Sequence, residues 1–600
     1  GRLAGSNIPL VSVQHQYLVT EAIPGVTADL PTLRDPDRLS YVLVDGGGLV
    51  MGGYEPNPSP WAEDGSPPGC KFTLRENNWD HFEPLMEQAI TRVPALADAG
   101  IRQMFNGPES FTPDGNFILG EAPERNNGLV GAGFNAFGIA SGGGAGMALA
   151  EWVLNGVPPF DLWPVDIRRF GQPHRDIEWV RGRTLEAYAR HYTMAWPLEE
   201  NVSCRPSRRS PLYDTLKSSG ACFGEKLGWE RPNWFADNPQ AAHDEYGFGR
   251  QNWFDAVGRE HAAVRERVAI FDQSSFAKYR VSGVDAEQAL TWICAGDVAV
   301  DPGRVVYTQL LNTGGGIESD LTVTRIAADE YYLVTGTGFA THDLDWIRRN
   351  IPAGLDARVD DVTTAWAVLS LMGPKSRDVL QALVRDDLSN QVFPFASMRE
   401  LAVSGATLRA LRVSYVGELG WELHVPVESA LSVYQALMAA GADQGIVNAG
   451  YRAIESLRLE KGYRAWGADI GPDYSPLEAG LGWAVDLKSG KDFIGRGAIV
   501  AQQGQPLTRS LACFTLGDRD VVLLGRETIY RNDERVGWLS SAGWGYTVGA
   551  NIGFGYVRST DGVDRGFLES GRYELEVAGE RVACEWQPGP LYDPTMQKMK

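Results

Sequence analysis

Two segments combine residue types that could bind and polarise a small molecule. In one, NTGGGIESDLTVT, a glycine-rich turn precedes Asp320 and a predicted strand. In the other, YVGELGWE, the spacing predicts that Tyr415 and Glu422 lie on opposite arms of a hairpin that turns at its glycines. A carboxylate placed there can accept two parallel hydrogen bonds from an aminopyrimidinone ring. Taken alone, the pattern around Asp320 is more typical of a turn residue or a helix cap than of a ligand site, and the hairpin by itself does not establish a binding site.

A third segment, Gly138–Gly146, reads GIASGGGAG and is predicted to be a turn that leads into a helix over Met147–Leu154. Glycines let a backbone approach a ligand closely, and a helix N-terminus offers free N–H groups and positive charge. A reduced flavin, negative near N1 and C2=O, would suit such a site. A tight strand–helix turn without a ligand is the alternative. No G-x-G-x-x-G occurs in the chain, and Gly131–Ala136 (GAGFNA) is the nearest variant.

Composition limits the class of protein. The 600 residues predict about three to five domains, and 44% hydrophobic with 22% charged residues is typical of globular proteins. A net charge of −21 disfavours a nucleic-acid partner. The six cysteines are scattered without a C-x-x-C, which favours a reducing compartment over a disulfide framework or zinc site. The longest uncharged stretch, Asn126–Ala150, contains 8 glycines and is too poor in apolar bulk for a transmembrane helix.

The elements that must position these segments follow from periodicity. Before residue 158, strands are predicted at Gln16–Ala22 and Ser40–Gly53, and an amphipathic helix at Asp80–Ala99. Residues 158–240 are aromatic, rich in proline and irregular, as in a connecting region. From about Phe248 the pattern is regular α+β, and from about Leu507 it is strand-rich like a small barrel. Predicted helices there are Asp285–Ala295, His342–Asn350, Lys375–Val384, Ser429–Ala440 and Ala449–Gly462, and predicted strands are Tyr331–Thr335, Ala365–Leu371 and Thr407–Val425.

Several segments of the first part resemble one family. SFTPDG with GEAP precedes GAGFNAFGIASGGGAG, a combination similar to the C-terminal part of the flavin domain in sarcosine and dimethylglycine dehydrogenases. The resemblance extends over nearly the whole chain in the same order. The other matching segments are VQHQYLVTE (Val13–Glu21), LRDPDRLSY (Leu33–Tyr41), GGYEPNP (Gly52–Pro58), DIRRF (Asp166–Phe170) and GWERPNWF (Gly228–Phe235).

The resemblance implies a FAD site. In that family a Rossmann half precedes this region, so we expect that the chain, which begins at Gly1, is a fragment whose FAD binding needs the missing N-terminal half. The resemblance assigns His15 and Tyr41 as catalytic residues that discharge and orient an N-methyl amine, work that suits a neutral histidine. A satisfied strand residue and a residue at the core edge are the alternatives. Residues implied to line the isoalloxazine ring are Phe137, Gly138, Ile139 and Ala140.

The later segments resemble the aminomethyltransferase (T-protein) of the glycine cleavage system, which binds tetrahydrofolate. GYRAIESLRLEKG and SPLEAGLGW also match it. The resemblance places Asp320 near folate N5/N10 as a catalytic residue and Tyr415 and Glu422 against the pterin. One departure is Ala453-Ile454-Glu455, where many T-proteins have Ala-Arg-Asp; Arg452 or Arg458 could contact the folate tail instead. The implied neighbours of the folate are Ser319, Leu321, Leu423 and His424.

These inferences predict a mixed α/β and α+β fold with four parts. They are the C-terminal part of a D-amino-acid-oxidase-like FAD domain (residues 1–165), a central connecting domain (166–240), an aminomethyltransferase-like folate domain (241–500) and a C-terminal β-barrel (501–600). The first of these parts would hold the amine site and the third the folate site.

The predicted function is flavin-dependent oxidative demethylation of an N-methylglycine, with transfer of the one-carbon unit to tetrahydrofolate. Sarcosine and dimethylglycine are alternative substrates, and oxygen and an electron-transfer flavoprotein are alternative electron acceptors. The expected location is the cytoplasm, or the mitochondrial matrix in a eukaryote, without a membrane, nucleic-acid or metal partner. Two other functions remain open: a non-catalytic regulatory subunit like that of pyruvate dehydrogenase phosphatase, and a folate-dependent methyl or aminomethyl transferase.

Overall fold

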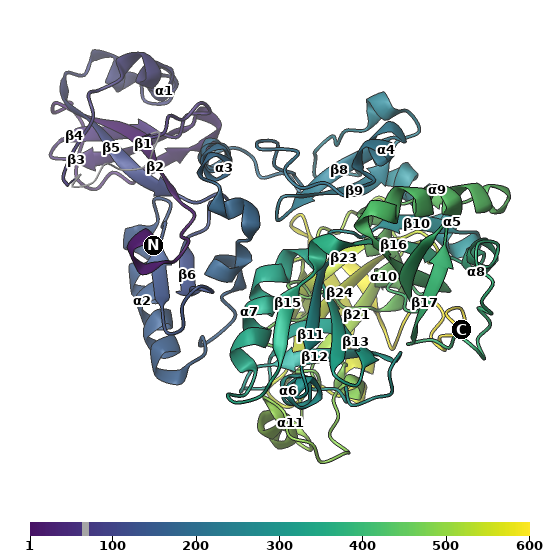
Figure 1. Cartoon of the computed structure of the whole chain (residues 1–600). Coiled ribbons are helices and arrows are strands. Elements are labelled where there is room, and N and C mark those ends of the chain that lie inside the picture. The colour runs from purple at the N-terminus through teal and green to yellow at the C-terminus, as the bar shows by residue number, and fades with distance from the viewer. Residues whose placement is uncertain (63–70) are drawn as a thin grey trace. The chain divides into compact units, whose positions relative to one another are not determined.

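The computed structural model describes residues 1–62 and 71–600, so Cys70 lies outside the described residues. The chain divides into two compact units, Gly1–Arg205 and Pro206–Lys600 (Figure 1). Each unit is described separately below. Among the described residues, no helix is long and apolar enough to cross a membrane.

Unit 1 is built on a five-stranded sheet in the order β2-β3-β4-β1-β5, with antiparallel pairing throughout. Apolar side chains alternate along the strands, so one face of the sheet packs against α1 through Leu18, Met51, Phe82 and Leu85. The predicted strand region of residues 40–53 is divided at Gly46–Gly48, whose glycine run indicates a turn, and forms a hairpin that turns at Gly46 and Gly47. The elements are β1 (Val11–Thr20), β2 (Leu33–Asp35), β3 (Ser40–Asp45), β4 (Gly48–Gly53), α1 (Trp79–Arg92) and β5 (Ile101–Phe111).

The rest of unit 1 differs from the sequence prediction at the glycine-rich segment. Gly138–Gly146 is not a turn: it forms the first half of α2 (Gly138–Asn155), which ends at Gly156 with φ +74°. Burial of Ala145, Ala148 and Trp152 against the unit holds this helix despite its glycines, which cost about 0.5–1 kcal/mol each. The irregular connecting region also contains a helix that was not predicted. The elements are β6 (Ile118–Glu121), β7 (Leu129–Ala132), α2 and α3 (Ile177–Ala189).

Unit 2 contains two sheets before its barrel, the first with one parallel pair, β10 with β20, and the second antiparallel throughout. Their strand orders are β17-β18-β19-β16-β10-β20 and β12-β13-β14-β11-β15. The strands are β10 (Ala269–Asp272), β11 (Ala277–Ser282), β12 (Val305–Leu311), β13 (Ile317–Ala327), β14 (Glu330–Thr335), β15 (Arg358–Asp361), β16 (Trp366–Met372), β17 (Met398–Val403), β18 (Ala406–Leu411), β19 (Gly420–Pro426) and β20 (Val447–Asn448).

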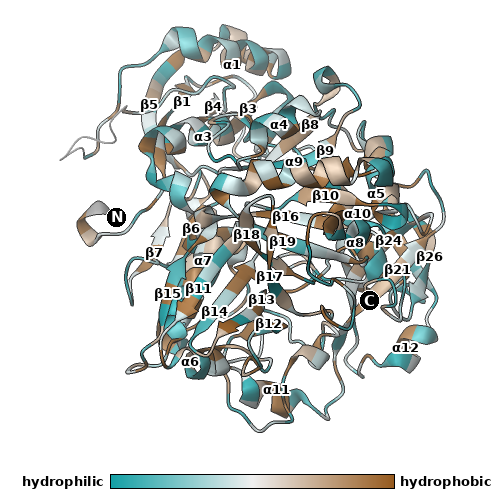
Figure 2. Ribbon diagram, turned by 45° about the vertical axis from the view of Figure 1, so that its right-hand side comes forward, coloured by the Kyte–Doolittle hydropathy of each residue, from teal (hydrophilic) through white to brown (hydrophobic). Residues whose placement is uncertain are grey.

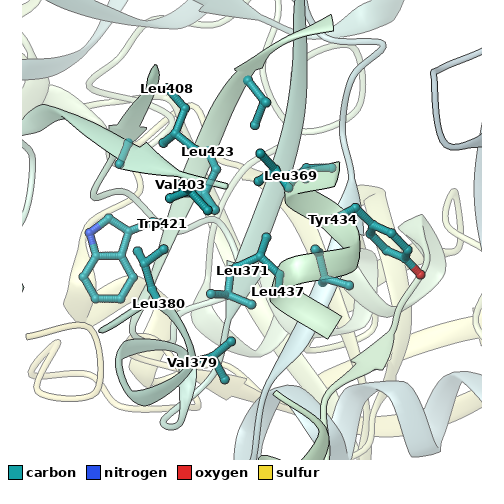
Figure 3. Packing of buried hydrophobic residues seen from close by; sticks show 14 of the residues in the cluster. Leu369, Leu371, Val379, Leu380, Val403, Leu408, Trp421, Leu423, Tyr434 and Leu437 are labelled. Atoms are coloured by element: carbon teal, nitrogen blue, oxygen red, sulfur yellow. The ribbon is translucent and has the colours of Figure 1, made fainter. Parts of the chain in front are cut away.

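Helices cover these sheets. Figure 3 shows Leu369, Trp421 and Leu423 of the first sheet packed with Leu380 and Leu437 of helices α8 and α9. Apolar stretches on the second sheet are brown in Figure 2. The helices are α4 (Tyr213–Ser218), α5 (Phe254–Glu266), α6 (Ala286–Ile293), α7 (Ala340–Asn350), α8 (Ser376–Gln381), α9 (Ala430–Ala440), α10 (Tyr451–Lys461) and α11 (Arg496–Gln502), and a separate hairpin is formed by β8 (Ala221–Lys226) and β9 (Trp229–Phe235).

The predicted C-terminal barrel is confirmed as a closed barrel in the order β21-β24-β23-β22-β25-β26. Closure pairs every strand edge, which removes the exposed backbone groups of an open sheet. The barrel elements are β21 (Arg509–Leu516), β22 (Thr528–Arg531), β23 (Glu534–Gly545), β24 (Ala550–Arg558), α12 (Arg565–Glu569), β25 (Tyr573–Val577) and β26 (Glu580–Gln587).

A buried carboxylate joins the barrel to helices α5 and α10. Glu460 contacts Arg265 at 3.0 Å and His261 at 3.3 Å, and accepts the backbone N–H of Thr547 at 2.7 Å. Burial opposes ionisation of Glu460, but the hydrogen bond from His261 and the charge of Arg265 outweigh it and lower its pKa to about 2. The ionised carboxylate therefore stabilises the folded state.

We expect Glu460→Gln to lower the free energy of unfolding at pH 7 by about 3 kcal/mol, because buried Arg265 loses one of the two carboxylates that pair with it. Since the folded pKa of about 2 lies below the ordinary 4.5, this stabilisation is present above pH 4.5 and is lost as the pH falls toward 2. Urea unfolding at pH 7 and pH 3 measures it. The control Glu455→Gln, on the same helix but exposed, should change stability by less than about 1 kcal/mol. Equal stability of Glu460→Gln and the unsubstituted protein at pH 7 would contradict this account.

Candidate functional site

His15 lies on β1 in a buried aromatic cluster of unit 1. Its Nε2 is 3.2 Å from the Tyr41 hydroxyl of β3, and its Nδ1 is 3.0 Å from the Tyr188 hydroxyl of α3. The Tyr54 ring lies 4.9 Å from the imidazole ring. Burial lowers the pKa of His15 to about 4, although the charge of Glu55 works in the opposite direction. The histidine is therefore neutral at physiological pH and can accept a proton.

A glycine makes room for Tyr41 beside His15. Gly52 pairs with Tyr41 on one side and with Tyr17 on the other. A Cβ at Gly52 would lie within 2.4 Å of the Tyr41 hydroxyl. The Tyr41 ring therefore crosses β4 at this position, where only glycine leaves the space, and the structure brings the two predicted residues into direct contact.

The predicted isoalloxazine-lining residues stand at the N-terminus of α2. Phe137 is the residue before the helix, and its side chain provides no cap. The N–H groups of Gly138, Ile139 and Ala140 therefore lack intrahelical acceptors, as at any helix start. Beyond them, a Cβ added at Gly142 or Gly143 would meet nothing within 4 Å. The open glycine face and free donors fit the pyrimidine edge of a flavin, which is negative when reduced.

A row of rings connects this helix start with His15. Phe137 lies 5.6 Å from His191, His191 lies 4.2 Å from Tyr54, and Tyr54 lies 4.9 Å from His15. The sequence did not indicate Tyr54, Tyr188 or His191. Tyr188 and His191 come from the connecting region predicted to be irregular, where α3 shows no clear amphipathic periodicity that could have indicated them. The predicted flavin contacts and the predicted amine site thus belong to one aromatic cluster.

In unit 2, Asp320 lies on β13 beside Tyr307 of β12. The Tyr307 hydroxyl donates to Asp320 Oδ2 at 2.9 Å, and the Tyr307 ring stacks 5.8 Å from Trp483, whose surface is 71% exposed. Burial raises the pKa of Asp320 to about 6, against the lowering effect of the Tyr307 hydrogen bond. A carboxyl group with this pKa can both give and take a proton near neutral pH.

Tyr415 and Glu422 are not opposite one another. Residues 412–419 form a long loop between β18 and β19, and Glu422 pairs with Leu411. The two strands do form an antiparallel hairpin, but Tyr415 lies in its loop, so the predicted placement of Tyr415 on the arm opposite Glu422 is wrong. Tyr415 donates to the carbonyl of Arg464 at 2.8 Å and is close enough to Asp320 for the carboxylate to raise its pKa, after the larger effect of burial.

Glu422 has its own partner, His424, two residues along β19. Its carboxylate lies 3.8 Å from His424 Nε2, longer than a hydrogen bond, so it retains capacity to accept donors from a ligand. His424 is fully buried, and its Nδ1 lies 2.9 Å from the hydroxyl of Tyr332. This carboxylate fits the donor edge of an aminopyrimidinone, and the carboxyl of Asp320 fits a ring amine.

Other predicted folate neighbours face away. Leu321 and Leu423 pack in the hydrophobic cores of the two sheets, and buried Ser319 shares the face of Leu321 by strand alternation. At these positions only backbone atoms can reach a ligand on the opposite face. Both candidate arginines are paired: Arg452 with Asp244 at 2.7 Å, and Arg458 with Asp469 at 2.7 Å.

Unit 1 and unit 2 together define a two-part class: a flavin-oxidase fragment joined to a folate-binding domain with a barrel. Four family profiles match the chain in this order. They are "FAD dependent oxidoreductase" (residues 1–152), "FAD dependent oxidoreductase central domain" (155–210), "GCVT N-terminal domain" (212–489) and "Glycine cleavage T-protein C-terminal barrel domain" (509–593). The predicted fold class is confirmed.

The chain belongs to the sarcosine and dimethylglycine dehydrogenase family. It is 41% identical to mouse (Mus musculus) sarcosine dehydrogenase, over 100% of this chain and 69% of that protein. It is 37% identical to human dimethylglycine dehydrogenase, over 93% of this chain and 65% of that protein. The mouse regulatory subunit of pyruvate dehydrogenase phosphatase is 35% identical over 98% and 69%.

A solved structure shows the same fold for unit 2. The glycine cleavage system aminomethyltransferase T of Bartonella henselae aligns with a TM-score of 0.55 and 25% identity. The alignment covers 65% of this chain and 99% of that one. A cofactor set of FAD and tetrahydrofolate therefore matches both halves of the chain.

We expect Tyr307→Phe to raise the pKa of Asp320 above about 6, because the lost hydrogen bond stabilises the carboxylate. The chemical shift of the Asp320 carboxyl carbon, assigned by its loss in Asp320→Asn, follows this titration. Trp483→Phe is the control, since the indole stacks on Tyr307 without a hydrogen bond to Asp320, and it should leave the midpoint nearly unchanged. An unchanged midpoint in Tyr307→Phe would contradict the assigned role of this hydroxyl.

Proposed function

We propose that this protein oxidises an N-methylglycine, sarcosine or dimethylglycine, and passes the released one-carbon unit to tetrahydrofolate. The observation that carries the proposal is the pairing of a buried neutral base, His15, hydrogen-bonded to Tyr41, with a separate carboxyl site at Asp320. Identity of 41% to a sarcosine dehydrogenase supports this substrate class.

At the amine site, bound FAD supplies the acceptor for two electrons from the methyl C–H bond. Phe137 and the free N–H groups of Gly138–Ala140 would hold its ring. A methyl group on a protonated amine does not give up hydride, so the protein must first remove the proton from the amine nitrogen. Tyr41 accepts the N–H of the bound amine and His15 takes up the proton, while the aromatic cluster excludes water.

At the second site, tetrahydrofolate supplies an amine that captures the one-carbon unit. Glu422 would accept hydrogen bonds from the pterin, and Tyr415 would contact its ring. Asp320 would hold and exchange the proton of the reacting amine, work that its pKa of about 6 suits. Without capture, water would release the unit as formaldehyde.

The remaining assignments are proposals of the same kind. We propose domain boundaries at residues 165, 240 and 500, supported by the order of the family profiles. An electron-transfer flavoprotein or oxygen would reoxidise the enzyme. Relatives named as mitochondrial support the matrix as the location in a eukaryote, and the cytoplasm is the location in a bacterium.

Anaerobic mixing of the FAD-loaded protein with sarcosine or dimethylglycine tests the amine half. We expect the flavin to bleach, and His15→Asn to slow bleaching by about 100-fold or more, because the proton acceptor is lost. Tyr192→Phe, a change in the same cluster that leaves the His15 contacts intact, should bleach at nearly the normal rate. If none of the N-methyl amines bleaches the flavin, the proposal is wrong.

A non-catalytic regulatory role is the second candidate, favoured by the 35% identity to the phosphatase regulatory subunit. Asp320→Asn distinguishes the two. If the protein is an enzyme, we expect folate-dependent capture of the one-carbon unit to fall by about 100-fold in this variant. If it is a non-catalytic scaffold, its regulatory activity should not change. Tetrahydrofolate binding, followed by fluorescence, should change little in the same variant and so exclude misfolding as the cause.

A further inference from the structure

A chain of hydrogen bonds leads from His15 to the surface of unit 1. His15 Nδ1 lies 3.0 Å from the Tyr188 hydroxyl, which donates to Glu55 Oε2 at 3.1 Å. The second carboxylate oxygen, Oε1, lies 2.9 Å from His81 Nε2. Tyr188 and Glu55 are buried, the His15 side chain is 13% exposed, and the His81 side chain is 22% exposed. The chain therefore connects a buried base with water.

The donors of this chain fix the tautomer of His15. Tyr188 donates its single O–H to Glu55 Oε2. The Tyr188 oxygen then accepts the Nδ1–H of His15, and neutral His15 presents a lone pair at Nε2. Tyr41 consequently donates its O–H to Nε2, which leaves the Tyr41 oxygen free to accept. In each of these hydrogen bonds the donor is therefore the residue nearer the amine and the acceptor the residue farther from it.

We propose that Tyr188, Glu55 and His81 form a proton relay that orients His15 and exchanges the proton of the substrate amine with solvent. The inference rests on the proposed amine oxidation and adds three residues to it. Tyr188 and Glu55 act through His15 and Tyr41, so they are relay and positioning residues.

The step balances along four bonds. The ammonium N–H breaks as an O–H forms on Tyr41, and the former Tyr41 proton binds His15 Nε2. The Nδ1 proton of His15 passes to Tyr188, and the Tyr188 proton passes to Glu55. Protonated Glu55 then gives its proton to His81 Nε2, and His81 releases its Nδ1 proton to solvent. Over the whole relay the positive charge of the amine passes to solvent, so no net charge accumulates in the cluster. Run in reverse, the same row returns a proton to the product amine.

Elements far apart in the sequence build this row. Glu55 follows β4, His81 lies in the first turn of α1, and Tyr188 comes from α3, 133 residues after Glu55. The hydrogen bond with Glu55 raises the pKa of His81, which favours a proton at the solvent end of the relay. Through Tyr188, the central connecting domain (residues 166–240) thus contributes a residue to the proposed relay as well as joining two domains.

Other charged groups surround His15, and one competes with Tyr188. Glu109 Oε2 lies 3.5 Å from His15 Nδ1, and burial together with Glu55 raises its pKa to about 7. At this distance it is a weaker acceptor than Tyr188 at 3.0 Å. The remaining titratable groups facing the cluster are Tyr41, Tyr54, Tyr192 and His191, with Arg34 lowering the pKa of His191 after burial. A test must therefore separate Glu55 from Glu109.

The first test needs no turnover. In the protein labelled with ¹⁵N-histidine, the His15 signals, assigned by their loss in His15→Asn, report which nitrogen carries the proton. We expect Nδ1 to be protonated and Nε2 to be bare at pH 7. A proton on Nε2, or on both nitrogens, would overturn the relay.

The second test follows anaerobic flavin reduction against pH in the FAD-loaded protein. We expect Tyr188→Phe and Glu55→Gln to slow reduction about tenfold or more at pH 6 and to recover at high pH, where the free amine is already neutral. Substrate affinity at high pH should be unchanged. Tyr192→Phe and Glu109→Gln are the matched controls and should retain the normal profile.

The outcomes distinguish the relay from the reaction. If the unsubstituted protein is reduced but Tyr188→Phe and Glu55→Gln both keep its pH profile, the relay is wrong and the amine oxidation stands. If Glu109→Gln alone shifts the profile, Glu109 is the acceptor and the relay is wrong. If no N-methyl amine reduces the flavin, the proposed function fails, and the tautomer measurement still decides the hydrogen-bond row.

Discussion

A methyl group bonded to a charged ammonium does not give up hydride, and this constraint accounts for the architecture of unit 1. The site must remove a proton without holding water near the reacting bond. Burial of His15 in a cluster of tyrosines lowers its pKa to about 4 and keeps it neutral. The β-sheet supplies His15 and Tyr41 from β1 and β3, the two strands that flank β4, and Gly52 of β4 provides the space in which they meet.

In unit 2, burial also shifts the pKa of a candidate site residue, but that residue is an acid rather than a base. Burial that makes His15 harder to protonate makes Asp320 easier to protonate, and raises its pKa to about 6. The Tyr307 hydroxyl limits that rise by stabilising the carboxylate. Burial thus keeps His15 neutral and brings the pKa of Asp320 to about 6, where a carboxyl group can both give and take a proton. Buried Glu460 differs, because its partners hold it ionised and make it structural.

The sequence predicted helices and strands more successfully than it predicted contacts between side chains. Periodicity located the hairpin of residues 40–53, most helices of unit 2 and the barrel, since these patterns depend on local alternation. It failed at Gly138–Gly146, where tertiary burial of Ala145 and Ala148 overrides the low helix propensity of glycine. It also missed Tyr188 and Tyr307, because neither motif nor spacing reveals a hydroxyl that meets its partner across 173 residues or across two strands.

The central claim is that one protein oxidises an N-methylglycine and hands its methyl carbon to folate. The most direct measurement gives the FAD-loaded protein sarcosine or dimethylglycine, each labelled with ¹³C in the N-methyl groups, with and without tetrahydrofolate, and follows the label by NMR. For at least one of the two amines, the account predicts label in 5,10-methylenetetrahydrofolate when folate is present and in formaldehyde when it is absent. Label that stays in both amines, or that reaches only formaldehyde in the presence of saturating tetrahydrofolate, would contradict it.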